Sequence, residues 1–147
     1  MTLDDVIGKF ATKVFLEWFF MNNEPVSIIR LFIQINDIYL NITCCEENVI
    51  IKAQKESPTI MAFQEFSYKP IEQNIEWLNQ YKIVSIKYLI DSVNIKRGIL
   101  FTFENAHNLV YYNEGYKFDD IETFAIDVNL KQLPYIFTDV KYLILNR

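Results

Sequence analysis

One histidine and two cysteines limit the chemistry that this chain of 147 residues could perform. Nucleophilic catalysis of the Ser-His-Asp or Cys-His kind needs an imidazole base that a third group holds in place. His107 lies between Ala106 and Asn108 in a sequence typical of a turn, where we expect an exposed ring with little to orient it. Cys44, Cys45 and His107 also lack the spacing of zinc ligands. The sequence therefore predicts neither a catalytic residue nor a metal site.

Paired carboxylates are the other feature that could do chemistry, at Glu46-Glu47 and at Asp119-Asp120. Asp119, Asp120 and Glu122 could serve in hydrolysis or metal binding, but the calcium-loop pattern is absent from the sequence. Three glycines are also too few for the phosphate-binding loops of nucleotide-binding folds. We therefore expect no cofactor. An alternative stays open, a small-molecule-binding or hydrolytic domain with a carboxylate-lined pocket between a helix and a sheet.

Tyrosines and acids gather between residues 104 and 122. Tyrosine offers a large contact area with a polar tip, and carboxylates beside it favour a partner rich in Lys or Arg. The segment predicts a partner-binding surface made of Glu104, Tyr112, Glu114, Tyr116, Asp119, Asp120 and Glu122. The alternative is an ordinary hairpin, with one tyrosine in the core, one on the surface and its acids in solvent.

The overall composition favours a single domain, 1–147, because 51% of the residues are apolar and only three are glycine. A net charge of −5 and a pI near 4.9 argue against binding to nucleic acid. The N-terminal residues MTLDD lack the positive charge of a secretory signal, and Glu17 interrupts the apolar run that follows. We therefore expect a cytoplasmic protein with reduced thiols that contacts no membrane.

The N-terminal segment has the period of an amphipathic helix. Apolar residues recur at i, i+3 and i+4 from Leu3 to Phe19, with Thr2 as a candidate N-cap and Pro25 beyond the end. We expect this helix to pack on one face of a sheet. A second helix is predicted from Pro70 to Leu78, and the segment from Thr59 to Phe66 could form a short third one.

The stretch Ile28–Cys45 specifies a β-hairpin that turns at Asn36-Asp37. This turn makes every opposed pair on one face apolar: Ile35 with Ile38, Ile33 with Leu40, Leu31 with Ile42, and Ile29 with Cys44. Further strands are predicted at Val49–Gln54, Lys82–Asp91, Gly98–Glu104, Leu109–Asn113, Asp120–Asp127 and Thr138–Asn146. The expected fold class is therefore α+β, an antiparallel, meander-rich sheet with the N-terminal amphipathic helix packed on one face.

The segment YYNEGYKFDD adds a resemblance, carried by Asn113, Gly115, Tyr116 and Asp119 at the end of a strand–turn–strand unit. With the small, acidic and Tyr-, Ile- and Asn-rich character of the chain, it resembles the immunity proteins of bacterial contact-dependent and polymorphic toxin systems, and related small bacterial domains. The resemblance implies a non-catalytic cytoplasmic protein that binds one cognate toxin domain, often a basic nuclease, and blocks its active site. An oligomeric structural module is a further possibility, and the oligomeric state stays open.

Overall fold

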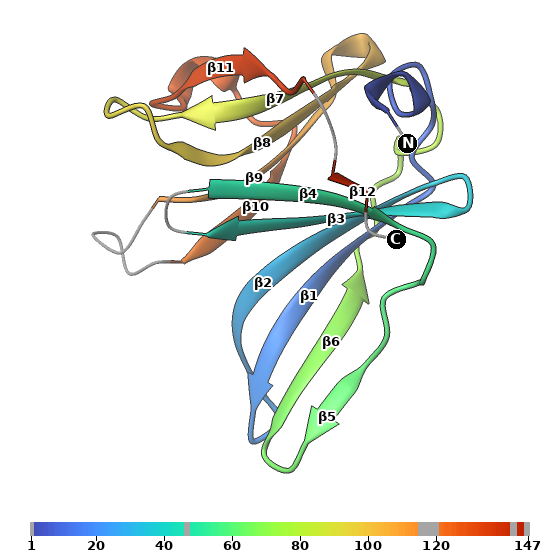
Figure 1. Ribbon diagram of the computed structural model, residues 1–147, viewed down its shortest axis with the longest axis vertical. Coiled ribbons are helices and arrows are strands. Elements are labelled where there is room, and N and C mark those ends of the chain that lie inside the picture. Colours follow the sequence, from blue (N-terminus) through green and yellow to red (C-terminus); the bar gives the residue numbers. More distant parts are fainter. Residues whose placement is uncertain (1, 46–47, 115–120, 142–143, 146–147) are drawn as a thin grey trace.

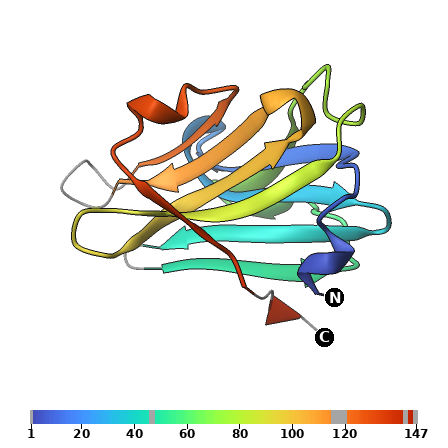
Figure 2. The same ribbon diagram turned by 90° about the horizontal axis from the view of Figure 1, so that it is seen from above.

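The computed structural model describes residues 2–45, 48–114, 121–141 and 144–145. The chain forms two β-sheets that pack face to face (Figures 1 and 2). The seven-stranded sheet has the order β12-β4-β3-β2-β1-β6-β5, and the five-stranded sheet has the order β10-β9-β8-β7-β11. All described pairs of strands are antiparallel except β12 with β4.

The strands of the seven-stranded sheet are β1 (Lys13–Met21), β2 (Glu24–Ile35), β3 (Ile38–Cys45), β4 (Asn48–Gln54), β5 (Met61–Phe63), β6 (Phe66–Glu72) and β12 (Ile144–Leu145). Those of the five-stranded sheet are β7 (Ile83–Ile90), β8 (Lys96–Phe103), β9 (Asn108–Asn113), β10 (Glu122–Ile126) and β11 (Ile136–Asp139). Within the described residues, three short 3₁₀ turns accompany them: η1 (Leu3–Asp5), η2 (Glu104–Ala106) and η4 (Leu130–Gln132). No helix within the described ranges has the length and apolar character needed to cross a bilayer.

The predicted hairpin is confirmed as β2 and β3. Three of the predicted pairs form: Ile35 with Ile38, Ile33 with Leu40, and Leu31 with Ile42. The turn begins with Asn36 in the left-handed region (φ 56°), which asparagine adopts more readily than most residues. The predicted pair of Ile29 with Cys44 does not form, because β2 is irregular just before Leu31, where its register against β1 shifts.

The predicted N-terminal helix, Leu3–Phe19, is wrong, and so is the α+β fold class; the fold is nearly all-β. Only η1 is helical in this segment, and β1 begins at Lys13. The residues of β1 are mostly aromatic or apolar, so they suit a strand that has neighbours on both sides. Pairing with β2 and β6 supplies those neighbours, which the helical period could not reveal. The pocket predicted between helix and sheet therefore has no helix to line it, while the alternative of a small-molecule-binding or hydrolytic domain stays a prediction.

The two shorter predicted helices are also wrong: strand and turn replace the one at Thr59–Phe66, and the one at Pro70–Leu78 is strand to Glu72, then loop and turn. Residues 59–66 contain β5 and its turn, and Pro70 lies inside β6. Proline is tolerated there because β5 reaches only as far as Tyr68 in its pairing with β6, which leaves Pro70 at a free edge that needs no N–H. The predicted strand Thr138–Asn146 divides into β11 and β12, which belong to different sheets.

The remaining strand predictions hold: Val49–Gln54, Lys82–Asp91, Gly98–Glu104 and Leu109–Asn113 are confirmed as β4, β7, β8 and β9. The strand predicted at Asp120–Asp127 is described from Glu122 to Ile126, as β10, while Asp120 lies outside the described residues.

The main core lies between the sheets. Most of the apolar face of the β2–β3 hairpin is buried there, with Ile29 and Ile38 half-buried. The second sheet, with Phe101 and Tyr111, takes the place expected for the helix. A smaller cluster lies on the other face of the five-stranded sheet, where residues 128–137 pack over Leu89, Leu100 and Val110 (Figure 2). This covering segment brings side chains from late in the chain onto β8 and β9.

Candidate functional site

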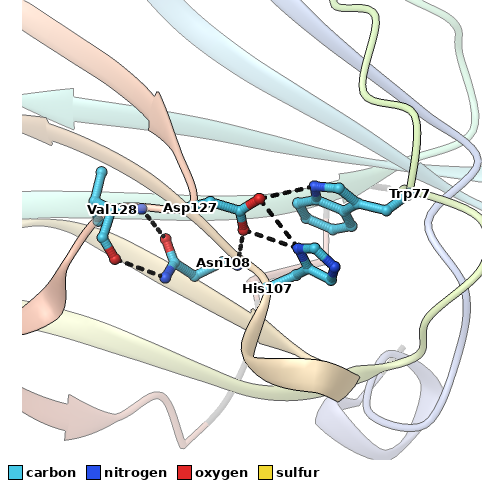
Figure 3. Close-up of polar contacts among 5 residues, drawn as sticks. All are labelled: Trp77, His107, Asn108, Asp127 and Val128. Carbon is cyan, nitrogen blue, oxygen red and sulfur yellow. Dashed lines mark hydrogen bonds and ion pairs between the residues drawn. The ribbon is translucent and has the colours of Figure 1, made fainter.

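His107 follows η2, in the connection between β8 and β9. Its Nδ1 lies 3.1 Å from each carboxylate oxygen of Asp127, the residue after β10 (Figure 3). An ionised carboxylate can only accept hydrogen bonds, so Nδ1 carries a proton and, in the neutral ring, Nε2 is left as an acceptor. The imidazole is therefore held in one orientation by a carboxylate.

Aromatic rings pack against His107. The His107 ring stacks on Trp77 with centroids 4.4 Å apart and planes inclined by 17°, and it contacts Tyr81 at 5.0 Å. Trp77 Nε1 donates a hydrogen bond of 3.1 Å to Asp127, and its ring meets Phe103 edge-on at 4.9 Å. The contacts join the segment before β7 to the turn after η2 and to the corner after β10.

Hydrogen bonds hold the backbone of Asp127 as well as its side chain. Its φ of 53° lies in the left-handed region, which aspartate tolerates better than most residues. Asn108 N donates to the Asp127 carboxylate at 3.0 Å, and Asp127 N donates to the Asn108 carbonyl at 2.9 Å. The Asn108 side chain donates to the Val128 carbonyl and accepts from Val128 N (Figure 3).

The expectation of an exposed, unoriented His107 is therefore wrong, since its side chain is 27% exposed and hydrogen-bonded. The sequence did contain a signal for the contact between His107 and Asp127. The predicted strands on either side of residues 114–119 pair so that Leu109 faces Ile126, which places the residues just before β9 next to Asp127. An imidazole oriented by a carboxylate is suited to proton transfer at Nε2. In the described ranges, no three His, Cys, Asp or Glu side chains gather into a metal-binding group.

The predicted partner-binding residues fall at both ends of β9. Glu104 lies at the His107 end, where its carboxylate accepts a hydrogen bond of 2.7 Å from Lys82 N. Tyr112 and Glu114 lie at the other end, where Glu122 pairs with Asn113. The other three predicted residues, Tyr116, Asp119 and Asp120, lie outside the described residues.

Glu122 and Tyr112 occupy opposite faces of the sheet. Tyr112 is paired with Thr123, so Glu122, the residue before Thr123 in β10, points to the other side. Burial, and then the negative charge of Glu122, raise the pKa of the fully buried Tyr111. Glu122 therefore acts on the interior between the sheets, apart from Tyr112.

Tyr112 instead meets Tyr135, a residue that the sequence did not indicate. The two half-buried rings lie edge to face, with centroids 5.7 Å apart. Burial and the charge of the exposed Glu114 raise the pKa of Tyr112, and the same two causes raise the pKa of Tyr135 to about 12. We call Tyr112, Glu114 and Tyr135 the tyrosine–acid cluster. Tyr135 reaches it because residues 128–137 fold back over the sheet.

An ion pair lies within electrostatic range of this cluster. The Asp91 carboxylate accepts hydrogen bonds from Arg97 Nε at 2.8 Å and from Ile95 N at 2.9 Å. These bonds outweigh the opposing effect of burial and lower the pKa of Asp91. Asp91 thus stays ionised and paired, and Glu114 supplies the exposed negative charge.

Comparison of the chain with models of protein families, with curated proteins and with solved structures gives no match.

Proposed function

We propose that this chain is a non-catalytic cytoplasmic binding protein, an immunity-type inhibitor that recognises a basic toxin domain. The tyrosine–acid cluster is the observation that supports the proposal. Two half-buried tyrosine rings lie in contact on one face of a sheet, and an exposed carboxylate acts on the hydroxyl groups of both. The net charge of −5 adds long-range attraction for a basic partner.

The chemistry of the cluster suits an arginine or lysine side chain. A guanidinium or ammonium group binds to the face of a tyrosine ring and to a carboxylate at the same time. Tyr112 is also held in place, because β9 lies between β8 and β10 and its ring contacts Tyr135. A side chain that is already ordered loses little entropy when the partner binds.

Calorimetry with the basic toxin domain encoded beside this chain tests the proposal. We expect Glu114→Lys to weaken binding about a hundredfold, because a buried or central charge pair contributes about 2–3 kcal/mol at an interface. Tyr112→Ala should weaken binding about tenfold or more.

Glu56→Lys is the matched control, because it makes the same change in net charge at an exposed position outside the cluster. If the wild-type chain does not bind, the proposed function is wrong. If Glu56→Lys weakens binding as much as Glu114→Lys does, attraction depends on net charge alone and the cluster is not the interface.

A further inference from the structure

The ring nitrogen Nε2 of His107 reaches solvent. Asp127 holds the Nδ1 edge of the ring at 3.1 Å, and Figure 3 shows the second ring nitrogen pointing away from that carboxylate. The planes of Trp77 and Tyr81 are inclined to the imidazole by only 17° and 33°, so both residues contact its faces. Nε2 accepts no hydrogen bond within the described residues, and it does not belong to the buried atoms that lack a partner. The exposed 27% of the side chain therefore includes Nε2.

The opposite side of the ring fixes the hydrogen-bonding role of this exposed nitrogen. Because Nδ1 donates its proton to Asp127, the neutral imidazole presents a lone pair at Nε2 and accepts a hydrogen bond there. The Asp127 carboxylate is itself held by donors from Trp77 Nε1 and from Asn108 N, at 3.1 and 3.0 Å. The acceptor is therefore already oriented before a ligand arrives, so little conformational entropy is lost on binding.

The charged groups near the ring favour a cation as the ligand. The Asp127 side chain, 41% exposed, lies beside His107. Glu104, which the sequence predicted to bind a partner, belongs to η2, directly before His107. Its carboxylate accepts a hydrogen bond from the backbone of Lys82, while the ammonium group of Lys82 lies over the ring of Phe10, 5.7 Å from its centroid. Negative charge therefore predominates on the segments that adjoin His107.

We propose that His107 Nε2 is a binding site for the guanidinium group of an arginine side chain on the basic partner. A guanidinium group carries N–H donors and no acceptor, so it donates to Nε2 while the nearby carboxylates attract its charge. Its flat surface also suits the aromatic rings that flank the imidazole. The inference rests on the proposed function, because it adds a second contact for the same partner. His107 precedes β9, whereas the tyrosine–acid cluster lies at the other end of that strand.

Acid releases this ligand. Protonation turns Nε2 from an acceptor into a donor and gives the ring a positive charge, which repels a guanidinium group. Histidine is the side chain that ordinarily changes its charge between pH 5 and 8, and His107 is the only histidine in the chain. The other ionisable residues on the segments packed against the ring are of types that ordinarily titrate outside this range: Glu76, Tyr81, Lys82, Glu104 and Asp127.

Nuclear magnetic resonance of the His107 ring tests the inference on the wild-type chain, with N-acetyl-arginine amide as the probe. The ring signals are unambiguous, because the chain has one histidine. At pH 8 the nitrogen shifts should show a proton on Nδ1 and none on Nε2. The probe should move the Nε2 signal with a dissociation constant in the millimolar range, and its affinity should fall about tenfold between pH 8 and pH 5.5. N-acetyl-citrulline amide, which has the same shape and no charge, should bind at least tenfold more weakly.

Three results would overturn the inference: a proton on Nε2 at pH 8, equal binding of the two probes, or an affinity for the arginine probe that is the same at both pH values. His107→Phe extends the test to the basic toxin domain, because it keeps an aromatic ring beside Trp77 and removes the acceptor. Calorimetry at pH 8 should show binding about tenfold weaker than that of the wild type. If the probe binds as described and the toxin domain does not, the proposed function is wrong and the site at His107 stands. If the toxin domain binds and the probe does not, only the site at His107 is wrong.

Discussion

Gly98→Ala is the substitution for which the structure gives the sharpest expectation. Gly98 lies in β8, opposite Leu89 of β7 and Tyr112 of β9. A Cβ at this position would lie 2.6 Å from the Cα of Tyr112 and would overlap the Cβ of Tyr112 and the carbonyl oxygen of Tyr111. These atoms belong to the neighbouring backbone or are attached directly to it, so no rotation of a side chain can relieve the clash. The two strands would have to move apart.

The loss of stability in Gly98→Ala follows because the backbone of β9 cannot move away easily. Overpacking usually destabilises a protein by about 1–3 kcal/mol, and contact with backbone puts this site at the upper end. The smaller conformational freedom of alanine in the unfolded chain returns about 0.4–1 kcal/mol. We therefore expect a net loss of about 2–3 kcal/mol in the free energy of unfolding. For a chain of this size the melting temperature should fall by about 5–10 °C.

Gly8→Ala is the matched control, because the same methyl group at Gly8 would have no atom within 4 Å. Gly8 has a φ of +83°, so alanine there is strained by about 1 kcal/mol, partly offset by the unfolded chain. Chemical denaturation of both variants measures the difference. If Gly98→Ala is no less stable than Gly8→Ala, the close approach of β8 and β9 is not as described.

Three further substitutions test the polar contacts. Asp127→Asn should lower the free energy of unfolding by about 1–3 kcal/mol, because the hydrogen bonds from Trp77 and His107 lose their charged acceptor; thermal denaturation measures this. Glu114→Gln should lower the pKa of Tyr135, because its negative charge disfavours the phenolate; ultraviolet titration of the tyrosines records it. Burial raises the pKa of Glu17 above its ordinary value of 4.5, so the folded chain holds this proton more tightly than the unfolded chain. Stability should therefore fall as the pH rises through the window above 4.5, and Glu17→Gln should flatten that part of the profile, as urea denaturation at a series of pH values would show.

Each of these expectations has an outcome that contradicts it. Asp139→Asn, an exposed change in β11, should leave stability within about 0.5 kcal/mol, and an equal loss at Asp127 and Asp139 would refute the tie to His107. An unchanged tyrosine titration in Glu114→Gln would remove Glu114 from the cluster. For Glu17, a profile as steep in Glu17→Gln as in the wild type would show that other groups cause the slope.

The β2–β3 hairpin shows how far local sequence reasoning reaches. Asn36 suits a left-handed turn position, and the alternation of apolar residues on both sides allows only one register. Both signals lie within a few residues of each other, so the sequence predicted the pairing correctly. The pair of Ile29 with Cys44 failed because the register of β2 shifts at Ile29 against β1, a strand earlier in the chain.

The segment Lys13–Met21 shows where that reasoning stops. Its apolar residues are frequent enough to satisfy the helical period and the strand period together, so periodicity alone cannot separate the two. The strand forms because β2 and β6 bind its two edges, and both follow it in the sequence. Local sequence is also insufficient at Pro70. It predicts the start of a helix there, and only the pairing of β6 shows that Pro70 lies at a free strand edge.

In each candidate site, too, local sequence indicated some residues and only the fold brought in the others. The composition of residues 104–122 indicated Tyr112 and Glu114, but Tyr135 joins them only because residues 128–137 pack over the five-stranded sheet. Asp127 was visible as one acid among several, and pairing of β9 with β10 makes it the partner of His107. The sequence by itself thus determined turns, strand register and the chemical character of each segment, because these depend on neighbouring residues. The tertiary structure alone decided which segments meet, because contacts between distant strands depend on the surfaces that all of them bury together.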